Sequence, residues 1–505
     1  MGKTAELVIN ANESLGVISP LIYGHFSEHI GGVFYDGLWV GEDSPVENIH
    51  GFRKALVDSF AKIHPPVLRW PGGCFAETYD WRDGIGPRAS RPERINWWFS
   101  NDHRTESNAV GTHEFIDFCR LVGAEPYFAA NMTSTTPLHI RNWMEYCNAA
   151  EGLTTLARER GANGDPAPFN VKYWGIGNEN WGGGGQMSPE MYAREYMRYS
   201  TICNSLGQSP MRFIMCGANG HDISWTRRVM KEWGGVQYRE APTWGMSVHY
   251  YCGTAGQPQD FTDDQWYQQL FQADYMRRII EDHRAAMDEF DPDRRLALVV
   301  DEWGCWHKGG SGPSKGYNLF EQQSSMRDAM VAAMTLNTFN NHCDVVKMAN
   351  VAQLCNNLHS LYLAGGDHFV ETPNYHVFDM FKTHQGARHL AVSVCSETLE
   401  REGFRPMRTL SASASQKDGK ITITLANADL HEAQTVRLTT LGLCLTGQGQ
   451  MTTLCHEDVH ACNTFEAPRT VVPTTGTVSF DGDGAIAITV PAAGIVSIVA
   501  PIGVE

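Results

Sequence analysis

The stretch YWGIGNENW, residues 173–181, carries the clearest information about the fold. An apolar run begins at Val171 and ends in the pair Asn178-Glu179, which lies among glycines and tryptophans and is followed by four glycines at 182–185. Strands of a parallel α/β barrel have this pattern, because the carboxyl end of each strand delivers polar side chains into an open site. The sequence therefore predicts a barrel strand that ends in a functional carboxylate.

A second stretch with the same pattern, LALVVDEWG at residues 296–304, places Glu302 at the end of another apolar run. A single glutamate at a strand end is more often an ion-pair or helix-capping residue than a catalyst. Two glutamates in matching settings are the pair that a retaining glycosidase needs, one as proton donor and one as nucleophile. We therefore predict that Glu179 and Glu302 are catalytic.

Short apolar runs alternate with amphipathic helical stretches from about residue 18 to residue 389, which is typical of α/β architecture. A helix is predicted to begin after the capping residue Ser188, with Pro189 in its first turn. The candidate strands, counted with the two glutamate strands, approach the eight of a (β/α)8 TIM barrel. The others lie at 66–70, 126–129, 212–215, 245–249 and 345–348.

The pattern changes beyond about residue 390. Apolar and polar residues alternate in ITITL at 421–425 and in AIAITV at 485–490, and each run follows an Asp-Gly turn. This alternation predicts an antiparallel, jelly-roll-like β-sandwich. We therefore predict three parts: an N-terminal strand in residues 1–17 that joins the sandwich, a catalytic barrel at 18–389 and a β-sandwich domain at 390–505.

Composition limits what the chain binds. Its 505 residues carry a net charge of −17, which disfavours nucleic acid and anionic membranes as partners, since both need a basic surface. An uncharged substrate fits better. The thirteen cysteines contain no C-x-x-C pair, the N-terminus shows no signal-peptide pattern, and no apolar run reaches about eighteen residues. We expect free thiols, no membrane span and a cytoplasmic location.

Two further clusters of polar, aromatic and glycine residues occur, YGHFSEH at 23–29 and LRWPGGCF at 68–75. Arg69 in the second cluster is a candidate for keeping the nucleophile ionised, because a nearby cation favours a charged carboxylate. The histidines His25, His29 and His249 accompany no H-E-x-x-H pattern or cysteine pair, so we expect no metal and no other cofactor. Seven tryptophans near the motifs are expected to form an apolar wall for sugar rings: Trp70, Trp81, Trp97, Trp98, Trp181, Trp303 and Trp306.

In these motifs the chain resembles the α-L-arabinofuranosidases of glycoside hydrolase family 51, which belong to the clan of retaining (β/α)8-barrel glycosidases. The motifs follow one another in the family's order and span the whole predicted barrel, so together they are much more specific than any one of them. They are YGHFSEH at 23–29, RWPGG at 69–73, GNENW at 177–181, HYY at 249–251, DEW at 301–303 and ANVAQ at 349–353.

The resemblance implies a retaining, exo-acting α-L-arabinofuranosidase that releases terminal arabinofuranosyl residues from arabino-oligosaccharides or arabinose-containing polysaccharides. It implies Glu179 as general acid/base and Glu302 as nucleophile, in a homo-oligomer that is a hexamer in the family. Cys74 occupies a sugar-binding position where family members often carry asparagine, so the contact there is expected to differ. The other residues expected to hold the furanose are Glu28, Arg69, Asn178, Tyr251 and Gln353.

Three alternatives stay open at this point. The same fold and glutamate pair also serve retaining enzymes for other sugars, namely β-xylosidases, β-glucanases and galactofuranosidases. A non-catalytic carbohydrate-binding barrel would keep the fold without turnover. A metal-dependent barrel hydrolase or isomerase would lose activity with a chelator, which the glutamate mechanism does not predict. The N-terminus without a secretion signal favours short, imported oligosaccharides as substrates.

Overall fold

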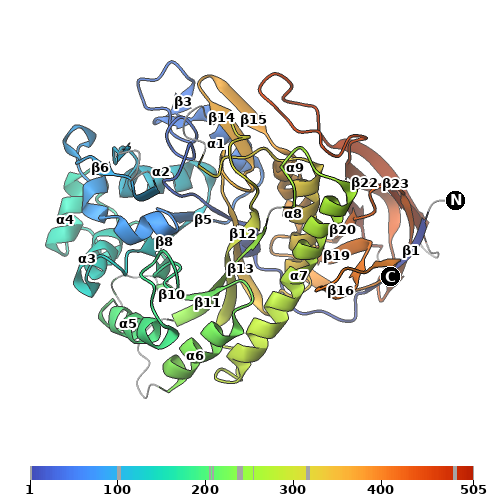
Figure 1. The fold of residues 1–505 in the computed structure, drawn as a ribbon, viewed down its shortest axis with the longest axis horizontal. Helices are drawn as coiled ribbons and strands as arrows, with labels where there is room; N and C mark the ends of the chain where they lie inside the picture. Colours follow the sequence, from blue (N-terminus) through green and yellow to red (C-terminus); the bar gives the residue numbers. More distant parts are fainter. Residues whose placement is uncertain are drawn as a thin grey trace. The chain divides into compact units, whose positions relative to one another are not determined.

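The computed structural model describes residues 3–98, 104–203, 206, 210–235, 243–253, 255–313, 319–481 and 486–503. Eight strands form a closed barrel in the order β10-β11-β12-β13-β2-β5-β8-β9 (Figure 1). Their bounds are β2 Gly24–Phe26, β5 Val67–Trp70, β8 Glu125–Ala130, β9 Tyr173–Ile176, β10 Arg212–Asn219, β11 Thr243–Cys252, β12 Ala297–Cys305 and β13 Val346–Ala352.

Strands β2, β5, β8, β9, β10 and β11 pair in parallel with their neighbours, so their carboxyl ends lie at one end of the barrel. Trp70, Phe128 and Trp174 lie opposite one another on adjacent strands and are fully buried. Figure 1 shows helices α3 to α6 outside these strands. The helices are α1 Lys54–Lys62, α2 Thr112–Val122, α3 Pro137–Asn148, α4 Thr155–Ala162, α5 Pro189–Ile202, α6 Ile223–Gly234, α7 Asp263–Asp288, α8 Met326–Asn340 and α9 Pro373–Phe381.

The predicted (β/α)8 barrel is confirmed, and each strand expected from the sequence overlaps one of its strands. The strand that sequence reasoning missed is β2, which was read as part of a polar cluster because it contains three residues only. The predicted start of α5 is also confirmed, since the Ser188 side chain accepts a hydrogen bond from the Met191 N–H and Pro189 is the first helical residue.

A separate nine-stranded sheet has the order β23-β22-β25-β20-β19-β16-β1-β21-β24. It turns at β16, which pairs with β19 through Arg388–Leu390 and with β1 through Ala391–Cys395. The bounds are β1 Lys3–Asn10, β16 Arg388–Cys395, β19 Leu410–Lys417, β20 Lys420–Asn427, β21 Gln434–Leu441, β22 Thr446–Leu454, β23 Thr474–Asp481, β24 Ile486–Val490 and β25 Ile495–Pro501.

The N-terminal strand β1 belongs to this sheet, as predicted for the segment before the barrel. Ala5, Leu7 and Ile9 are buried and join Ile423 and Ile498 in one apolar core, so the two arms of the bent sheet enclose a sandwich interior. One detail departs from a purely antiparallel sandwich, because β1 runs parallel to β21 while it pairs antiparallel with β16. The domain boundaries at residues 17 and 389 stay a prediction.

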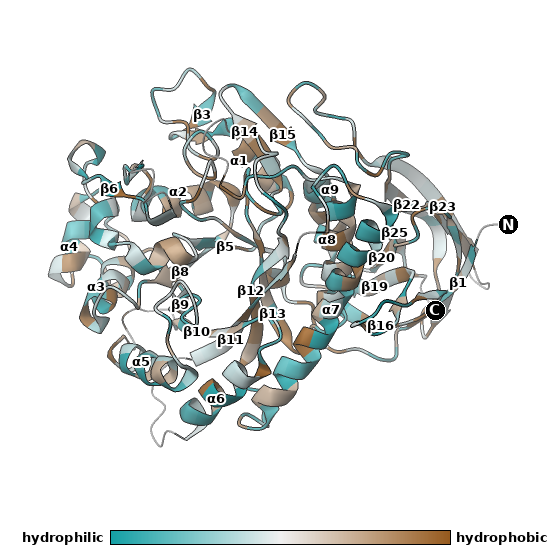
Figure 2. Cartoon of the chain, in the orientation of Figure 1, coloured by the Kyte–Doolittle hydropathy of each residue, from teal (hydrophilic) through white to brown (hydrophobic). Residues whose placement is uncertain are grey.

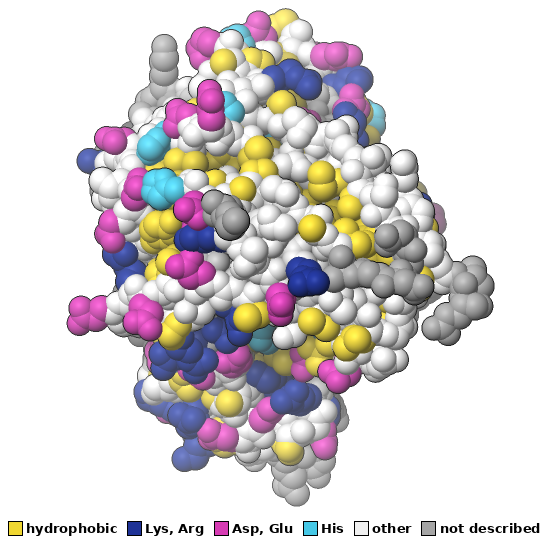
Figure 3. All heavy atoms as spheres, turned by 90° about the vertical axis from the view of Figure 1, so that its right-hand side faces the viewer, with side chains coloured by type: hydrophobic (Ala, Val, Ile, Leu, Met, Phe, Trp, Pro, Cys, Tyr) yellow, Lys and Arg dark blue, Asp and Glu magenta, His cyan; other side chains and the backbone are white. Residues whose placement is uncertain are grey.

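By compactness the chain divides into two units, residues 24–250 with 281–302 and residues 1–23 with 251–280 and 303–505. Helices α3 and α4 carry hydrophilic residues on their outer turns (Figure 2). Acidic, basic and apolar side chains are interspersed on the face shown in Figure 3. Among the described residues, no helix combines the length and the apolar character needed to cross a bilayer.

Candidate active site

Glu179 lies in a tight turn immediately after β9. Its φ of 45° falls in the left-handed region, which is costly for a residue other than glycine and persists only where the surroundings enforce it. The N–H groups of Gly182 and Gly184 donate to the Glu179 carbonyl at 2.7 and 3.1 Å. A Cβ on Gly184 would lie 1.9 Å from the Asn178 carbonyl oxygen. The glycine run is therefore needed for the close return of the backbone that shapes this turn.

Arg69, in β5, joins the ends of three strands. Its Nη1 donates to Glu302 Oε1 and its Nη2 donates to Asn178 Oδ1, both at 2.6 Å. Its Nε lies 3.6 Å from Asp301 Oδ2, which also accepts a hydrogen bond from the Tyr127 hydroxyl. Burial by itself would lower the pKa of the guanidinium, but Asp301 and Glu302 outweigh this effect and raise the pKa above its usual value. Arg69 is thus a buried permanent cation beside Glu302.

His249, in β11, contacts both predicted catalytic glutamates through one ring nitrogen. Its Nδ1 lies 3.0 Å from Glu179 Oε1 and 3.4 Å from Glu302 Oε2. Burial acts to lower the pKa of this imidazole, yet Glu302 and Glu179 together raise it above the ordinary value of 6.5. The ring is therefore held between the two carboxylates as a cation over a wider pH range than an exposed histidine.

The two predicted catalytic carboxylates are close together. An oxygen of Glu179, an oxygen of Glu302 and a nitrogen of His249 all lie within 4.8 Å of one another. Retaining glycosidases place their two carboxyl groups about 5–5.5 Å apart, whereas inverting enzymes need about 6.5–9.5 Å for an intervening water. The approach to within 4.8 Å is closer than the separation that an inverting enzyme needs.

Glu28 lies beside Glu302 across the backbone of Gly73. A Cβ on Gly73 would be 3.0 Å from Glu302 Oε1 and 3.4 Å from Glu28 Oε2, so a side chain there would crowd the Glu302 carboxylate. Glu28 Oε1 accepts hydrogen bonds from the Phe75 N–H at 3.0 Å and from the Trp98 indole at 2.9 Å. The predicted sugar-binding carboxylate is therefore fixed in orientation next to the predicted nucleophile.

Cys74 contacts the acid/base end of the site. Its thiol lies 3.6 Å from Glu179 Oε2, and the Asn178 Nδ2 lies 3.9 Å from its sulfur. Burial raises the pKa of the Cys74 thiol well above its usual range, and the Glu179 carboxylate raises it further. The side chain is therefore a neutral thiol that acts as a weak donor toward Glu179.

Tyr251 and Gln353, the remaining predicted sugar-binding residues, belong to the other compact unit. Tyr251, in β11, packs edge-on against Trp306 with ring centroids 5.1 Å apart. Gln353 follows β13, is 1% exposed, and its N–H donates to the Asn357 carbonyl. Their contact with a sugar stays a prediction.

The expected wall of tryptophans is wrong for three of its members. Trp70, Trp81 and Trp303 are at most 1% exposed and belong to the hydrophobic core, where large apolar side chains are most stable. Trp97 is 38% exposed and packs edge-to-face on Trp98. Of these five, this pair is accessible to a ligand.

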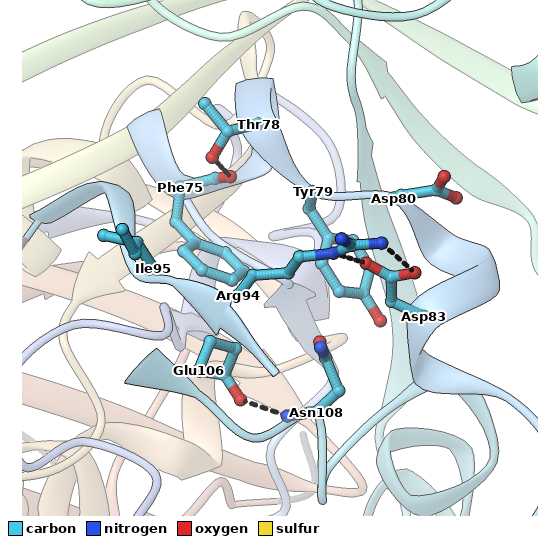
Figure 4. Close-up of a pocket in the computed structure, with 9 residues that line it drawn as sticks. All are labelled: Phe75, Thr78, Tyr79, Asp80, Asp83, Arg94, Ile95, Glu106 and Asn108. Atoms are coloured by element: carbon cyan, nitrogen blue, oxygen red, sulfur yellow. Dashed lines mark hydrogen bonds and ion pairs between the residues drawn. The ribbon is translucent and has the colours of Figure 1, made fainter. Parts of the chain in front are cut away.

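A cavity of about 430 Å³ lies behind the segment that carries Cys74 (Figure 4). Its charged groups are paired with one another or with neighbours: Arg94 binds Asp83, and Glu106 accepts from the Asn108 N–H and contacts His29. It includes neither predicted catalytic glutamate. The lining residues are Phe75, Thr78, Tyr79, Asp80, Asp83, Arg94, Ile95, Glu106 and Asn108.

Sequence reasoning missed three functional positions. His249 was weighed only as a metal ligand, although its place in a histidine-tyrosine motif at a strand end was a signal for the site. Trp98 was grouped with stacking tryptophans, but it donates a hydrogen bond to Glu28. Glu77, whose carboxylate binds the Asn178 N–H at 2.7 Å, had no signal in the sequence, because its partner is a backbone group.

Two groups of side chains have a geometry that could hold a cation, among the residues that are described. The first is Glu179, His249 and Glu302, and the second is Cys305, Asp328 and His359. In the second group Asp328 already accepts the Ser325 N–H in the capping box of α8, and the Cys305 N–H donates to His359 Nδ1. Asp328 and His359 therefore already accept hydrogen bonds that stabilise the fold.

Comparisons with known proteins agree with this geometry. Residues 59–251 match the family described as "Alpha-L-arabinofuranosidase 1 domain", and residues 301–493 match "Alpha-L-arabinofuranosidase C-terminal domain". A curated relative, the intracellular exo-α-L-arabinofuranosidase of Bacteroides ovatus, is 37% identical over 503 residues, which cover 98% of this chain and 95% of the relative.

Solved structures agree with the family match. The family 51 arabinofuranosidase of Xanthomonas axonopodis pv. citri superposes with a TM-score of 0.92 at 36% identity, covering 99% of this chain and all of that one. The α-L-arabinofuranosidase of Thermotoga maritima, solved as an arabinose complex, has a TM-score of 0.86 at 31% identity, again over 99% of this chain and all of the other.

The charge on His249 predicts a pH-dependent stability. A raised pKa means that the imidazolium–carboxylate contribution is fully present below about pH 6.5, the unfolded value, and is lost as pH rises through the folded value. His249→Asn should therefore lower Tm most near pH 6, and the gap to the unsubstituted protein should shrink toward pH 9. Thermal unfolding between these pH values tests it; a gap that is constant or that widens with pH would contradict the assignment.

Proposed function

The chain belongs to the α-L-arabinofuranosidases of glycoside hydrolase family 51 and is a glycoside hydrolase that acts on arabinofuranosides, and we propose that it does so by double displacement with Glu302 as nucleophile and Glu179 as acid/base. The observation that supports these roles is the approach of the two carboxylates to within 4.8 Å, with His249 contacting both. Specificity for another sugar and a non-catalytic barrel are disfavoured as alternatives for this chain, because the relatives named above are arabinofuranosidases.

In the first step a carboxylate oxygen of Glu302 attacks the anomeric carbon and the glycosidic C–O bond breaks. Glu179 gives its proton to the departing oxygen, so the leaving group departs as an alcohol and a covalent arabinosyl ester remains. In the second step Glu179 takes a proton from water, whose oxygen attacks the anomeric carbon and releases Glu302. Two inversions at one carbon give net retention.

The surrounding residues prepare the two glutamates for these roles. Arg69 donates a hydrogen bond to Glu302 Oε1 and so fixes the direction of the attacking carboxylate. Because Arg69 also occupies Asn178 Oδ1, the amide of Asn178 presents its Nδ2 as a donor for a sugar hydroxyl. Glu28, held by Trp98 and the Phe75 N–H, is an acceptor for hydroxyl groups of the furanose. Cys74, Tyr251 and Gln353 complete the proposed sugar-binding set.

We further propose that the enzyme removes terminal, non-reducing arabinofuranosyl residues from short arabino-oligosaccharides inside the cell. The name of the Bacteroides ovatus relative, an intracellular exo-acting enzyme that aligns over 98% of this chain, supports both parts. Oligosaccharides are the arabinose-containing chains that reach a cytoplasm, since whole polysaccharides do not cross the membrane.

Replacing the nucleophile should abolish turnover. Glu302→Ala is expected to lower kcat for 4-nitrophenyl α-L-arabinofuranoside by about 10⁴-fold or more, because no covalent intermediate can form. Asp83→Asn, a carboxylate variant in the cavity behind the site, should keep near-normal rates. Turnover of a panel of aryl xylosides, glucosides and galactofuranosides tests the sugar specificity. Near-normal turnover by Glu302→Ala would refute the assignment of Glu302 as the nucleophile.

Replacing the acid/base should make the rate depend on the leaving group. For Glu179→Ala we expect losses of about 10²- to 10⁴-fold with arabino-oligosaccharides and much smaller losses in glycosylation with 2,4-dinitrophenyl arabinofuranoside, which needs no proton. Added azide should attack the arabinosyl ester, release Glu302 and restore turnover as arabinosyl azide. Equal losses with all leaving groups and no azide product would show that Glu179 has another role.

We also propose a homo-oligomer, a hexamer by resemblance to the family. Size-exclusion chromatography with light scattering is expected to give six times the chain mass of 56.2 kDa. A mass equal to one chain at micromolar concentration would contradict assembly, and another multiple would correct the number of subunits.

A further inference from the structure

A buried carboxylate, Glu77, lies beneath the catalytic turn and takes no part in the proposed chemistry. It belongs to the short 3-10 helix Cys74–Thr78, which follows β5, and it is 2% exposed. The same helix carries Cys74 toward Glu179 and the Phe75 N–H toward Glu28. Glu77 thus originates from a segment that already contacts the site at two other points.

The two oxygens of Glu77 bind the backbones that follow two other barrel strands. Oε1 accepts the Asn178 N–H at 2.7 Å, and Oε2 accepts the N–H groups of Met132 and Thr133, each at 2.8 Å. Residues 131–133 follow β8 and residue 178 follows β9, so one carboxylate fastens the ends of β5, β8 and β9, which are adjacent in the barrel.

The clamp continues on the far side of the Glu179 turn. The Thr133 hydroxyl donates to the Gly184 carbonyl at 2.7 Å, and the Asn180 Nδ2 donates to the same oxygen at 2.7 Å. Gly184 in turn donates its N–H to the Glu179 carbonyl. The left-handed turn at Glu179 is therefore held on both sides. Glu77 binds the preceding residue, Asn178, and the loop that Glu77 holds binds Gly184 after the turn.

A carboxylate is chemically necessary at this position if it is to hold both loops. It offers two acceptor oxygens and no donor, whereas a glutamine amide of the same size offers one acceptor and a donating NH2 group that would face an N–H. Burial raises the pKa of Glu77, against the opposing effect of its N–H donors, so the site keeps this group despite a desolvation cost. If packing were the only role of this residue, an apolar side chain would fill the space without the desolvation cost of a buried carboxylate.

We propose that Glu77 is a positioning residue for acid/base catalysis: by binding the Asn178 N–H while it holds the 131–133 loop, it sets the direction in which Glu179 reaches the glycosidic oxygen. This inference rests on the proposed role of Glu179 as the acid/base. Glu77 touches neither the sugar nor the reacting atoms, and it acts through the backbone of the turn.

The test is the leaving-group dependence of Glu77→Gln. If the acid/base is displaced, kcat/KM for arabino-oligosaccharides should fall by about 10- to 100-fold, which is the cost of a misplacement of about 1 Å. The glycosylation rate with 2,4-dinitrophenyl arabinofuranoside should fall by less than about threefold. The inhibition constant for L-arabinose should change less than kcat/KM for the oligosaccharides, because Glu28 and Arg69 keep their contacts although Asn178 shifts. If Glu77 were purely structural, its replacement would lower the rates with both substrates by the same factor, because only the fraction of folded enzyme would change.

Glu114→Gln is the matched control. Glu114 is also a buried carboxylate that accepts a backbone N–H, from Gly111 at 2.9 Å, and it pairs with Arg91, but none of these contacts involves a residue of the site. It should lower Tm without changing the ratio of the two rates. Glu77→Asp provides a second variant that keeps the charge and both acceptors but shortens the reach, and it should show the same selective loss to a smaller extent.

The outcomes separate the two proposals. If Glu179→Ala shows leaving-group dependence and azide rescue but Glu77→Gln and Glu77→Asp slow all substrates equally, the positioning role is overturned and the acid/base role stands. If Glu77→Gln does not fold, Glu77→Asp decides by the same ratio. If Glu179→Ala shows no leaving-group dependence, the acid/base assignment itself fails, whatever the Glu77 variants do.

Discussion

The structure of the site depends on one buried cation, Arg69. A guanidinium that is 1% exposed is stable only where carboxylates and hydrogen-bond acceptors surround it, because an uncompensated buried charge is strongly destabilising. Asp301, Glu302 and Asn178 supply those groups from two other strand ends. The same requirement applies to the carboxylates, since Glu302 and Asp301 are also nearly inaccessible to solvent. The strand ends therefore meet at Arg69 because none of these charges is stable alone.

The two glutamates proposed as catalytic are held in different ways, and the difference suits the proposed roles. Glu302 is part of β12, its side chain is 7% exposed, and it is bound by a permanent cation, as a nucleophile that must stay charged and fixed requires. Glu179 stands in a left-handed turn and its side chain is 20% exposed. An acid/base must reach the leaving oxygen and later a water, which a partly exposed side chain allows.

Much of this arrangement follows from local sequence patterns. An apolar run that ends in Asn178-Glu179 or Asp301-Glu302 identifies a strand and its carboxyl end, and parallel strands of one barrel present those ends together. The period-two alternation at 421–425 identifies a strand of the sandwich, because successive side chains of a strand point to opposite faces. Both faces of this strand are buried, since Thr422 and Thr424 are buried as well as the apolar residues. The failures are equally local in origin. Strand β2 is too short for a periodic signal, and the identity of Trp70, Trp81 or Trp303 does not reveal whether its ring faces the core or the cleft.

The sequence by itself determined the fold class and the family and pointed to the two glutamates, because each depends on residue type and order along the chain. Only the tertiary structure decided how these residues cooperate. The contact of His249 with both carboxylates, the place of Arg69 between Glu302 and Asn178, and the hold of Glu77 on the Asn178 backbone join residues distant in sequence. Such contacts depend on the register and closure of the barrel. A backbone N–H donates to an acceptor whatever its own side chain is, so this contact leaves no mark on the identity of its residue.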